Sequence, residues 1–208
     1  MNEDKAALRR WFVAAILGLA ALVSGIGASF PRNTWLQVGP VLLVAVVLPW
    51  LMKRWPLSRV AWGSVVIFLL LHLFAAHWTY SDVPYENWLR HIGVDSRNVL
   101  GTSRNMFDRI VHFAFGLLAI SPLVELEMRF TGVDRRLALR LAILFVLASS
   151  AAYEVFEWLL AVSMSPEAAE AYNGQQGDGF DPQKDMAMAF SGAAVSLVVL
   201  CFSRRSAR

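Results

Sequence analysis

Six apolar blocks of about twenty residues each constrain this chain more than any other feature of its sequence. A helix needs about 20 mostly apolar residues to cross a bilayer, where its backbone must satisfy its own hydrogen bonds. The chain has 208 residues, so the blocks leave little room for anything else. We therefore predict an all-α, polytopic membrane protein with six transmembrane helices in one bundle, built as a single integral membrane domain over residues 1–208. The predicted spans cover about 11–30, 35–52, 60–80, 106–128, 139–164 and 185–202.

The composition supports a membrane protein and excludes several other classes. Apolar residues make up 57% of the chain and charged residues 17%, whereas about 25% of a soluble domain is charged. The net charge of +3 does not indicate nucleic-acid binding, because the basic residues lie at the ends of the apolar blocks. We therefore expect the lipid bilayer, and no nucleic acid, as a partner. The single cysteine, Cys201, excludes an internal disulfide and a multi-cysteine metal cluster. The sequence contains no nucleotide or haem signature and none of the common hydrolase motifs.

The distribution of Lys and Arg predicts how the chain crosses the membrane. Cytoplasmic loops carry an excess of basic residues, and thirteen of the nineteen basic residues fall in one set of loops. We therefore predict that both termini are cytoplasmic and that two long loops, about 81–105 and 165–184, lie on the outer side. The first block is longer than the apolar region of a signal peptide, so we expect it to remain in the protein. The thirteen residues are Lys5, Arg9, Arg10, Lys53, Arg54, Arg59, Arg129, Arg135, Arg136, Arg140, Arg204, Arg205 and Arg208.

The first outer loop contains a pattern that favours a short helix. Tyr85, Trp88, Leu89 and Ile92 follow the spacing i, i+3, i+4, i+7 of one helical face. Such an amphipathic helix would lie in the plane of the outer interface. The alternative is a loop in which these aromatic residues have no structural meaning.

Polar side chains recur near the outer ends of the last three spans. Asp108 and His112 lie four residues apart and share a face of the fourth span, and Glu154 and Glu157 lie three apart on the fifth. The predicted orientation places all of these groups near the outer face. Ionisable residues inside a span are costly and mark functional sites, so we predict that they form one polar site. Three further carboxylates lead into the sixth span: Asp178, Asp181 and Asp185.

So many carboxylates cannot all remain charged and unpaired in a medium of low dielectric constant. One divalent metal ion would compensate them, and a histidine with carboxylates at these spacings offers suitable ligands. An oxygen-rich ligand set accepts Mg²⁺, Ca²⁺ or Mn²⁺, whereas His112 also allows Zn²⁺ or iron. The alternatives are ion pairs with Arg104, Arg109 and Lys184, or protonation of the carboxylates as in a proton relay.

Four segments of the chain resemble the motif blocks of a known family. They are HLFAAHWTYSDVP at 72–84, RNMFDRIVHF at 104–113, YEVFEW at 153–158 and GQQGDGFDPQKDM at 174–186. In order and spacing they are similar to the YjdF family of inner-membrane proteins, which has no assigned activity. The resemblance therefore implies the bacterial inner (cytoplasmic) membrane. The chain departs from the family pattern at Val111, where a glycine is expected, and at Phe180, where a tryptophan is usual. A more distant likeness, limited to the polar blocks, is to VanZ-like membrane proteins linked to glycopeptide resistance.

The first functional hypothesis is a metal-assisted hydrolase or transferase that acts on a lipid or lipid-linked substrate at the outer leaflet. In this hypothesis Glu157 is the general base, and Asp108 and Arg109 are further catalytic residues. The residues expected to bind one divalent metal ion are His112, Glu154, Asp178, Asp181 and Asp185. The residues expected to bind the substrate are Arg104, Tyr153, Gln176 and Lys184.

Two alternatives remain open at this point. The same carboxylates could form the cation or proton site of a small ion- or proton-coupled transporter. The cytoplasmic halves of the same spans are almost wholly apolar, however, and offer no second polar layer to complete a path. The other alternative is a structural membrane protein that is held together by a buried ion-pair network. A bound metal would distinguish the enzyme from this structural protein.

Overall fold

Helices make up almost all of the structure. The computed structural model describes residues 2–95, 98–99 and 101–202, and within them it contains no strand. The long helices are α1 (Asn2–Gly25), α2 (Pro31–Arg54), α3 (Arg59–His77), α6 (Phe107–Phe130), α7 (Arg135–Ser163) and α9 (Asp181–Phe202). Two short helices, α4 (Tyr85–His91) and α8 (Pro166–Asn173), lie in the two long loops.

All six long helices are long and apolar enough to cross a membrane, which confirms the prediction of six spans. Most of them extend beyond the predicted spans. The α1 helix begins at Asn2 instead of residue 11 and ends at Gly25 instead of residue 30. The α9 helix begins at Asp181, four residues before the predicted start. The early starts arise because a charged turn can remain helical beyond the apolar block, where hydropathy alone gives no signal. The early end of α1 arises because the chain turns at Gly27, whose φ of 70° is not helical.

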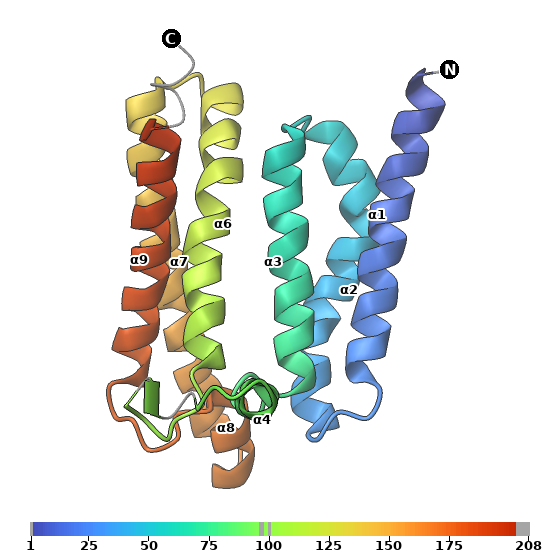
Figure 1. Cartoon of the computed structure of the whole chain (residues 1–208). Coiled ribbons are helices and arrows are strands. Elements are labelled where there is room, and N and C mark those ends of the chain that lie inside the picture. The colour runs from blue at the N-terminus through green and yellow to red at the C-terminus, as the bar shows by residue number, and fades with distance from the viewer. Residues whose placement is uncertain (1, 96–97, 100, 203–208) are drawn as a thin grey trace.

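The spans form two groups of three helices (Figure 1). In one group α1, α2 and α3 pack against one another, and in the other α6, α7 and α9 do. Each group has its own apolar core, with Leu17, Leu48 and Leu73 in the first and Ile120 and Val146 in the second. Among the spans, the contact between α3 and α6 joins the groups, because α2 and α7 do not pack against each other in the described part of the chain.

Two glycines bring α6 and α9 into close contact. A side chain at Gly116 would overlap the carbonyl group of Ala189, and one at Gly192 would overlap the carbonyl group of Phe113. Small residues at such positions let two helix backbones approach closely inside a membrane. This contact fixes α6 and α9 side by side, so their first turns lie at the same level.

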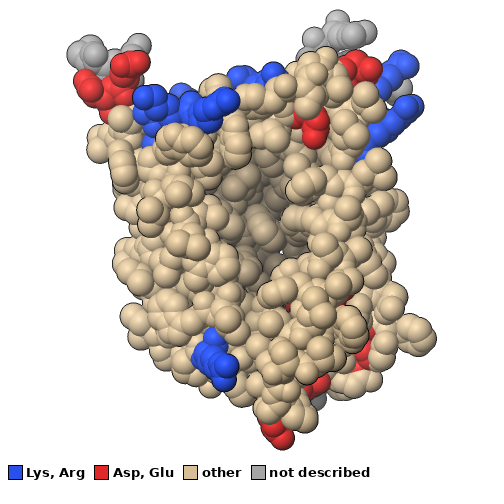
Figure 2. Space-filling model, turned by 180° about the vertical axis from the view of Figure 1, so that it is seen from behind, with Lys and Arg blue, Asp and Glu red and all other residues tan. Residues whose placement is uncertain are grey.

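The two ends of the bundle differ in charge. The helix α1 begins and α9 ends at the same end (Figure 1), which also carries Lys53, Arg54, Arg59, Arg129 and Arg135. We call it the basic end, and the opposite end, with α4 and α8, the loop end. Figure 2 shows the Lys and Arg side chains gathered at the basic end. Of the thirteen basic residues used to predict the orientation, Arg204, Arg205 and Arg208 lie outside the described residues.

Polar contacts also tie the elements together at both ends. At the basic end, the Ser58 hydroxyl caps α3 by accepting from the Ala61 N–H, and the Glu125 carboxylate of α6 accepts from the Ser58 N–H at 2.7 Å. At the loop end, the predicted short helix is present as α4. Its Trp88 ring packs against Phe74 of α3, with 6.2 Å between ring centroids.

Candidate functional site

Three helices bring their polar residues together near the loop end. Asp108 lies in the first turn of α6, and Asp181 and Asp185 lie one turn apart at the start of α9. Because α6 and α9 are in close contact, these carboxylates face one another across that contact. Glu154 of α7 joins them from the third side. All four carboxylates are buried, with 9% or less of each residue exposed.

The centre of the site is a group of three residues that could hold a metal ion. Ligand atoms of Asp108, His112 and Asp185 all lie within 4.8 Å of one another. The Nε2 atom of His112 is 3.6 Å from Oδ1 of Asp108 and 4.0 Å from Oε1 of Glu154. These separations are too long for good hydrogen bonds. They suit ligands of one cation, because metal–ligand distances of about 2.0–2.6 Å place neighbouring ligands roughly 3–4 Å apart.

Within the described part of the chain, two buried carboxylate oxygens in or beside this group lack a hydrogen-bond partner. Among the described residues, neither Oε1 of Glu154 nor Oδ1 of Asp185 has one, although both atoms are buried. A basic atom near them is Nε of Arg109, 3.8 Å from Oδ1 of Asp185. A buried, uncompensated carboxylate is strongly unfavourable. A bound cation, or a proton on one of these carboxyl groups, would compensate the charge.

Two further carboxylates, those of Asp178 and Asp181, are compensated by basic side chains. Arg104 pairs with Asp181 at 2.5 Å, and Arg109 contacts Asp178 at 2.6 Å and Asp181 at 3.2 Å. Lys184 contacts Asp178 at 2.6 Å. Hydrogen bonds from Lys184 and Arg109 hold the pKa of the Asp178 carboxyl well below its usual range. We call these five residues the ion-pair network.

Arg104 also connects the network to the loop before α9. Its guanidinium donates to the backbone carbonyl groups of Gly174 and Gln175. Gln176 then forms two hydrogen bonds with the backbone of Asn105, accepting at 2.8 Å and donating at 3.1 Å. These contacts hold the start of α6 against the loop that leads into α9, and so they position Asp108 relative to Asp185.

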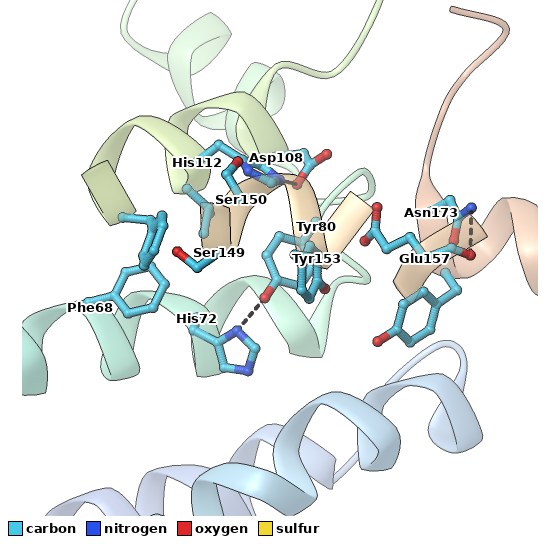
Figure 3. A pocket seen from close by; sticks show the side chains of 13 residues that line it. Phe68, His72, Tyr80, Asp108, His112, Ser149, Ser150, Tyr153, Glu157 and Asn173 are labelled. Atoms are coloured by element: carbon cyan, nitrogen blue, oxygen red, sulfur yellow. Dashed lines mark hydrogen bonds and ion pairs between the residues drawn. The ribbon is translucent and has the colours of Figure 1, made fainter. Parts of the chain in front are cut away.

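A cavity of about 310 Å³ opens beside this candidate metal-ligating group of Asp108, His112 and Asp185 (Figure 3). Asp108, His112 and Glu157 line it on one side, and the aromatic rings of Phe68 and Phe115 line the part nearer the basic end. Its other polar lining residues are His72, Tyr80, Ser149, Ser150, Tyr153, Tyr172 and Asn173. The cavity therefore combines candidate catalytic groups with apolar surface.

A strained turn places Tyr80 in this cavity. Thr79 and Tyr80 have φ angles of 46° and 60°, a left-handed conformation that residues with a side chain rarely adopt. The Tyr80 hydroxyl hydrogen-bonds to Nδ1 of His72, and Nε2 of His72 bonds to the Gln37 carbonyl at 3.0 Å. Because a carbonyl group can only accept, Nε2 of His72 carries the proton and Nδ1 accepts from Tyr80. Strain of this kind concentrates at functional sites.

Two tyrosines of the cavity outside the membrane spans, Tyr80 and Tyr172, keep their protons at neutral pH. Burial raises the pKa of Tyr80 well above its usual value, and it raises the pKa of Tyr172 to about 12. The Tyr80 hydroxyl already donates its one proton to His72, so of these two groups the Tyr172 hydroxyl is the one that can donate a hydrogen bond to a bound molecule. Sequence analysis did not single out Tyr172, which lies in α8 within a segment expected to be a loop.

The candidate residues fall into three groups in the structure. Asp108, His112, Tyr153 and Glu157 line the cavity. Glu154 and Asp185 lie beside His112. Arg104, Arg109, Asp178, Asp181 and Lys184 form the ion-pair network, and Gln176 holds the loop; none of these six lines the cavity.

Comparison with known proteins places the chain in a family. The family described as predicted membrane protein, DUF2238, matches residues 9–206. The chain belongs to this family. It is also 32% identical over 191 residues to the inner membrane protein YjdF of Escherichia coli strain K12, covering 90% of this chain and 86% of that protein. No solved structure matches. The DUF2238 match and this relative confirm the resemblance to the YjdF family that the four sequence segments indicated.

Proposed function

We propose that this DUF2238 member is an inner-membrane enzyme that uses one divalent metal ion to hydrolyse or transfer a group of a lipid or lipid-linked substrate at the outer leaflet. The observation that carries the proposal is the group formed by Asp108, His112 and Asp185. It lies beside a cavity that is lined largely by residues of membrane-spanning helices. Unpartnered buried oxygens of Glu154 and Asp185 support a cation in this position.

The donor set supports a role in catalysis. One histidine and two carboxylates leave coordination positions open for water or substrate, as catalytic metal sites require. Glu154, with Oε1 4.0 Å from Nε2 of His112, is placed to complete the ligand set. A cation held here would polarise a phosphoryl or carbonyl oxygen, or activate water.

The remaining residues take supporting roles in this proposal. Glu157 lines the cavity and does not belong to the three-residue ligand group, so it is free to act as the general base. Tyr153 contacts the substrate from the same helix face. We assign Asp178 and Asp181 to the ion-pair network rather than to the metal, because their oxygens already contact Arg104 and Arg109. The network then acts by positioning Asp185.

Transport has less support than catalysis. The cavity that continues toward the basic end is lined almost wholly by apolar side chains, with Ser64 among the few polar groups. An ion or proton would find no continuous polar path along it.

Elemental analysis tests the proposal. The full-length protein is purified in detergent without chelator, and its metal content is compared with that of His112→Ala and Asp185→Asn. We expect about one equivalent of metal in the parent and a loss of roughly tenfold or more in both variants. Asp178→Asn is the matched control. It removes a carboxylate that belongs to the ion-pair network and not to the ligand group, so this variant should keep the metal. A parent without metal, or variants that retain it, would overturn the proposal.

A further inference from the structure

Three cavities of the molecule are parts of one groove. The cavity beside the metal-ligating group shares Phe68 and Phe115 with a second cavity of about 320 Å³. It shares Phe68, His72 and Tyr153 with a third cavity of about 300 Å³. On α3 the lining runs from Trp62 to His72, which is about 15 Å at 1.5 Å per residue. The groove therefore leads from the polar site toward the basic end.

The groove opens sideways between α2 and α7. These two helices form its walls without packing against each other, and α7 has no packing contact with α3 in the described residues. Figure 2 shows the resulting hollow between the two halves of the molecule. Both walls belong to membrane-spanning helices, so the medium at the mouth of the groove is lipid hydrocarbon.

We propose that this groove binds the hydrocarbon chain of a membrane lipid, which enters between α2 and α7 and leaves its headgroup in the polar cavity. The inference rests on the proposed function for the chemistry at the headgroup end. It deepens that function by identifying the substrate class as a lipid whose chain is held by the protein during the reaction.

The polarity of the groove matches that of one lipid molecule. Its outer end carries Asp108, His112 and Glu157, whereas the part toward the basic end is lined by Leu69, Trp62 and other apolar residues. A lipid of the outer leaflet has the same order, with the headgroup at the outer level and the chain directed to the bilayer centre. The orientation used here, with the basic end in the cytoplasm, is the one predicted from the charged loops.

A hydrocarbon chain fits the lining better than another transmembrane helix does. Helix interfaces in membranes are enriched in small residues that allow close backbone approach. This groove is lined mainly by large side chains, including Phe68, Phe115, Trp55, Trp62 and Leu123. Large side chains keep the backbone of another helix from approaching closely, whereas a flexible hydrocarbon chain can lie between them.

Photocrosslinking tests this proposal. The full-length protein is reconstituted into phosphatidylcholine vesicles with a small share of phosphatidylglycerol that carries a diazirine in the middle of one acyl chain. After illumination, lipid adducts are mapped by mass spectrometry. We expect adducts concentrated on the α3 and α6 segments around Phe68 and Phe115. Adducts spread evenly over lipid-facing residues such as Val46 and Val195 would overturn the proposal.

Variants that fill the groove provide the second part of the test. Ser64 lines the groove, so Ser64→Trp should reduce the groove adducts by roughly tenfold, the scale expected when a packed site is overfilled. Ser64→Leu is a milder variant that should reduce them less. Ile67→Trp is the control, because Ile67 lies on the same helix, is 57% exposed and lines none of the three cavities.

The outcomes separate this inference from the proposed function. His112→Ala should lose metal and keep the groove adducts, whereas Ser64→Trp should lose adducts and keep metal. If the parent protein forms groove adducts but contains no metal, the proposed metal-dependent function is contradicted and the groove inference is not. Adducts that Ser64→Trp leaves unchanged would overturn the groove inference alone. A groove without adducts in a protein that is dimeric in the vesicles would instead assign the groove to a second copy of the chain.

Discussion

The ion pair between Arg104 and Asp181 is almost fully buried, with 8% and 3% of the two side chains exposed. Removing one partner of a buried pair costs about 3–5 kcal/mol when the other charge is left alone, and the lower end of this range applies here because Arg109 still contacts Asp181 at 3.2 Å. Arg104→Gln should therefore lower the free energy of unfolding by about this amount, measured by thermal unfolding in detergent. Arg90→Gln is the control, because Arg90 is exposed and bonds to Asn87 in α4. Equal thermal stability of the two variants would show that the pair does not hold α9 in place.

Asp178 makes stability depend on acid pH. Its pKa is lowered in the folded protein by hydrogen bonds from Lys184 and Arg109. The stabilisation is therefore complete above the ordinary Asp pKa of about 4, and it is lost as the pH falls from there through the lowered pKa. Asp178→Asn removes this dependence. Unfolding curves recorded at a series of pH values should show the gap between parent and variant closing below about pH 4; a constant gap would contradict the assignment.

The sequence predicted which site residues lie together where their spacing places them on one face of a helix. The pairs Asp108 with His112 and Glu154 with Glu157 follow from helical spacing, and loop charge then places them at one level. The sequence contains no signal for Tyr80, because its position depends on a left-handed turn at two residues with ordinary side chains. The sequence also could not show which groups the arginines contact. Whether Arg104 contacts a substrate or Asp181 depends on side-chain packing across three segments.

At the scale of the helices, the contact between α6 and α9 depends on Gly116 and Gly192. A methyl group at either position would overlap a backbone carbonyl of the other helix. We expect Gly116→Ala and Gly192→Ala each to destabilise the protein by about 1–3 kcal/mol, the usual cost of overpacking. Gly18→Ala in α1 is the matched control, since nothing lies within 4 Å of its added methyl group. Thermal unfolding of the three variants measures the difference, and a Gly116→Ala variant as stable as the control would refute the contact.

Apolar block length predicted the number and order of the spans but not all of their ends. Asp181 belongs to α9 although it lies before the apolar block, and this extra turn brings Asp181 and Asp185 onto one helix face. Hydropathy cannot detect such a turn, because its charges are satisfied by partners distant in sequence. For the same reason, the bond from Ser58 to Glu125 could not be predicted.

At the scale of the whole molecule, the orientation can be tested with the single natural cysteine. Cys201 is exposed and lies in the last turn of α9, at the basic end. A membrane-impermeant maleimide should label it only after the cells are permeabilised, because basic loops remain in the cytoplasm. Glu167→Cys, made in a Cys201→Ala background, should be labelled in intact cells, since Glu167 is exposed in α8 at the loop end. Labelling of Cys201 in intact cells would reverse the orientation.

The groove lay beyond sequence analysis for a different reason. Hydrophobic periodicity shows which residues of a span avoid water, but in a membrane both a neighbouring helix and lipid satisfy this requirement. Nothing in the sequence indicates that α2 and α7 fail to meet. The two groups of helices are visible only in three dimensions (Figure 1), and so is the hollow between them (Figure 2).

A groove that opens toward hydrocarbon has a practical consequence for biochemistry. In a micelle, the molecules nearest to the opening between α2 and α7 are detergents, whose alkyl tails resemble the chain of a lipid. Detergent would then compete for the groove at millimolar concentration and suppress turnover without affecting the fold. Activity is therefore better measured in nanodiscs, in which a polymer extracts the protein together with its native lipids. There the opening between α2 and α7 still faces the original bilayer.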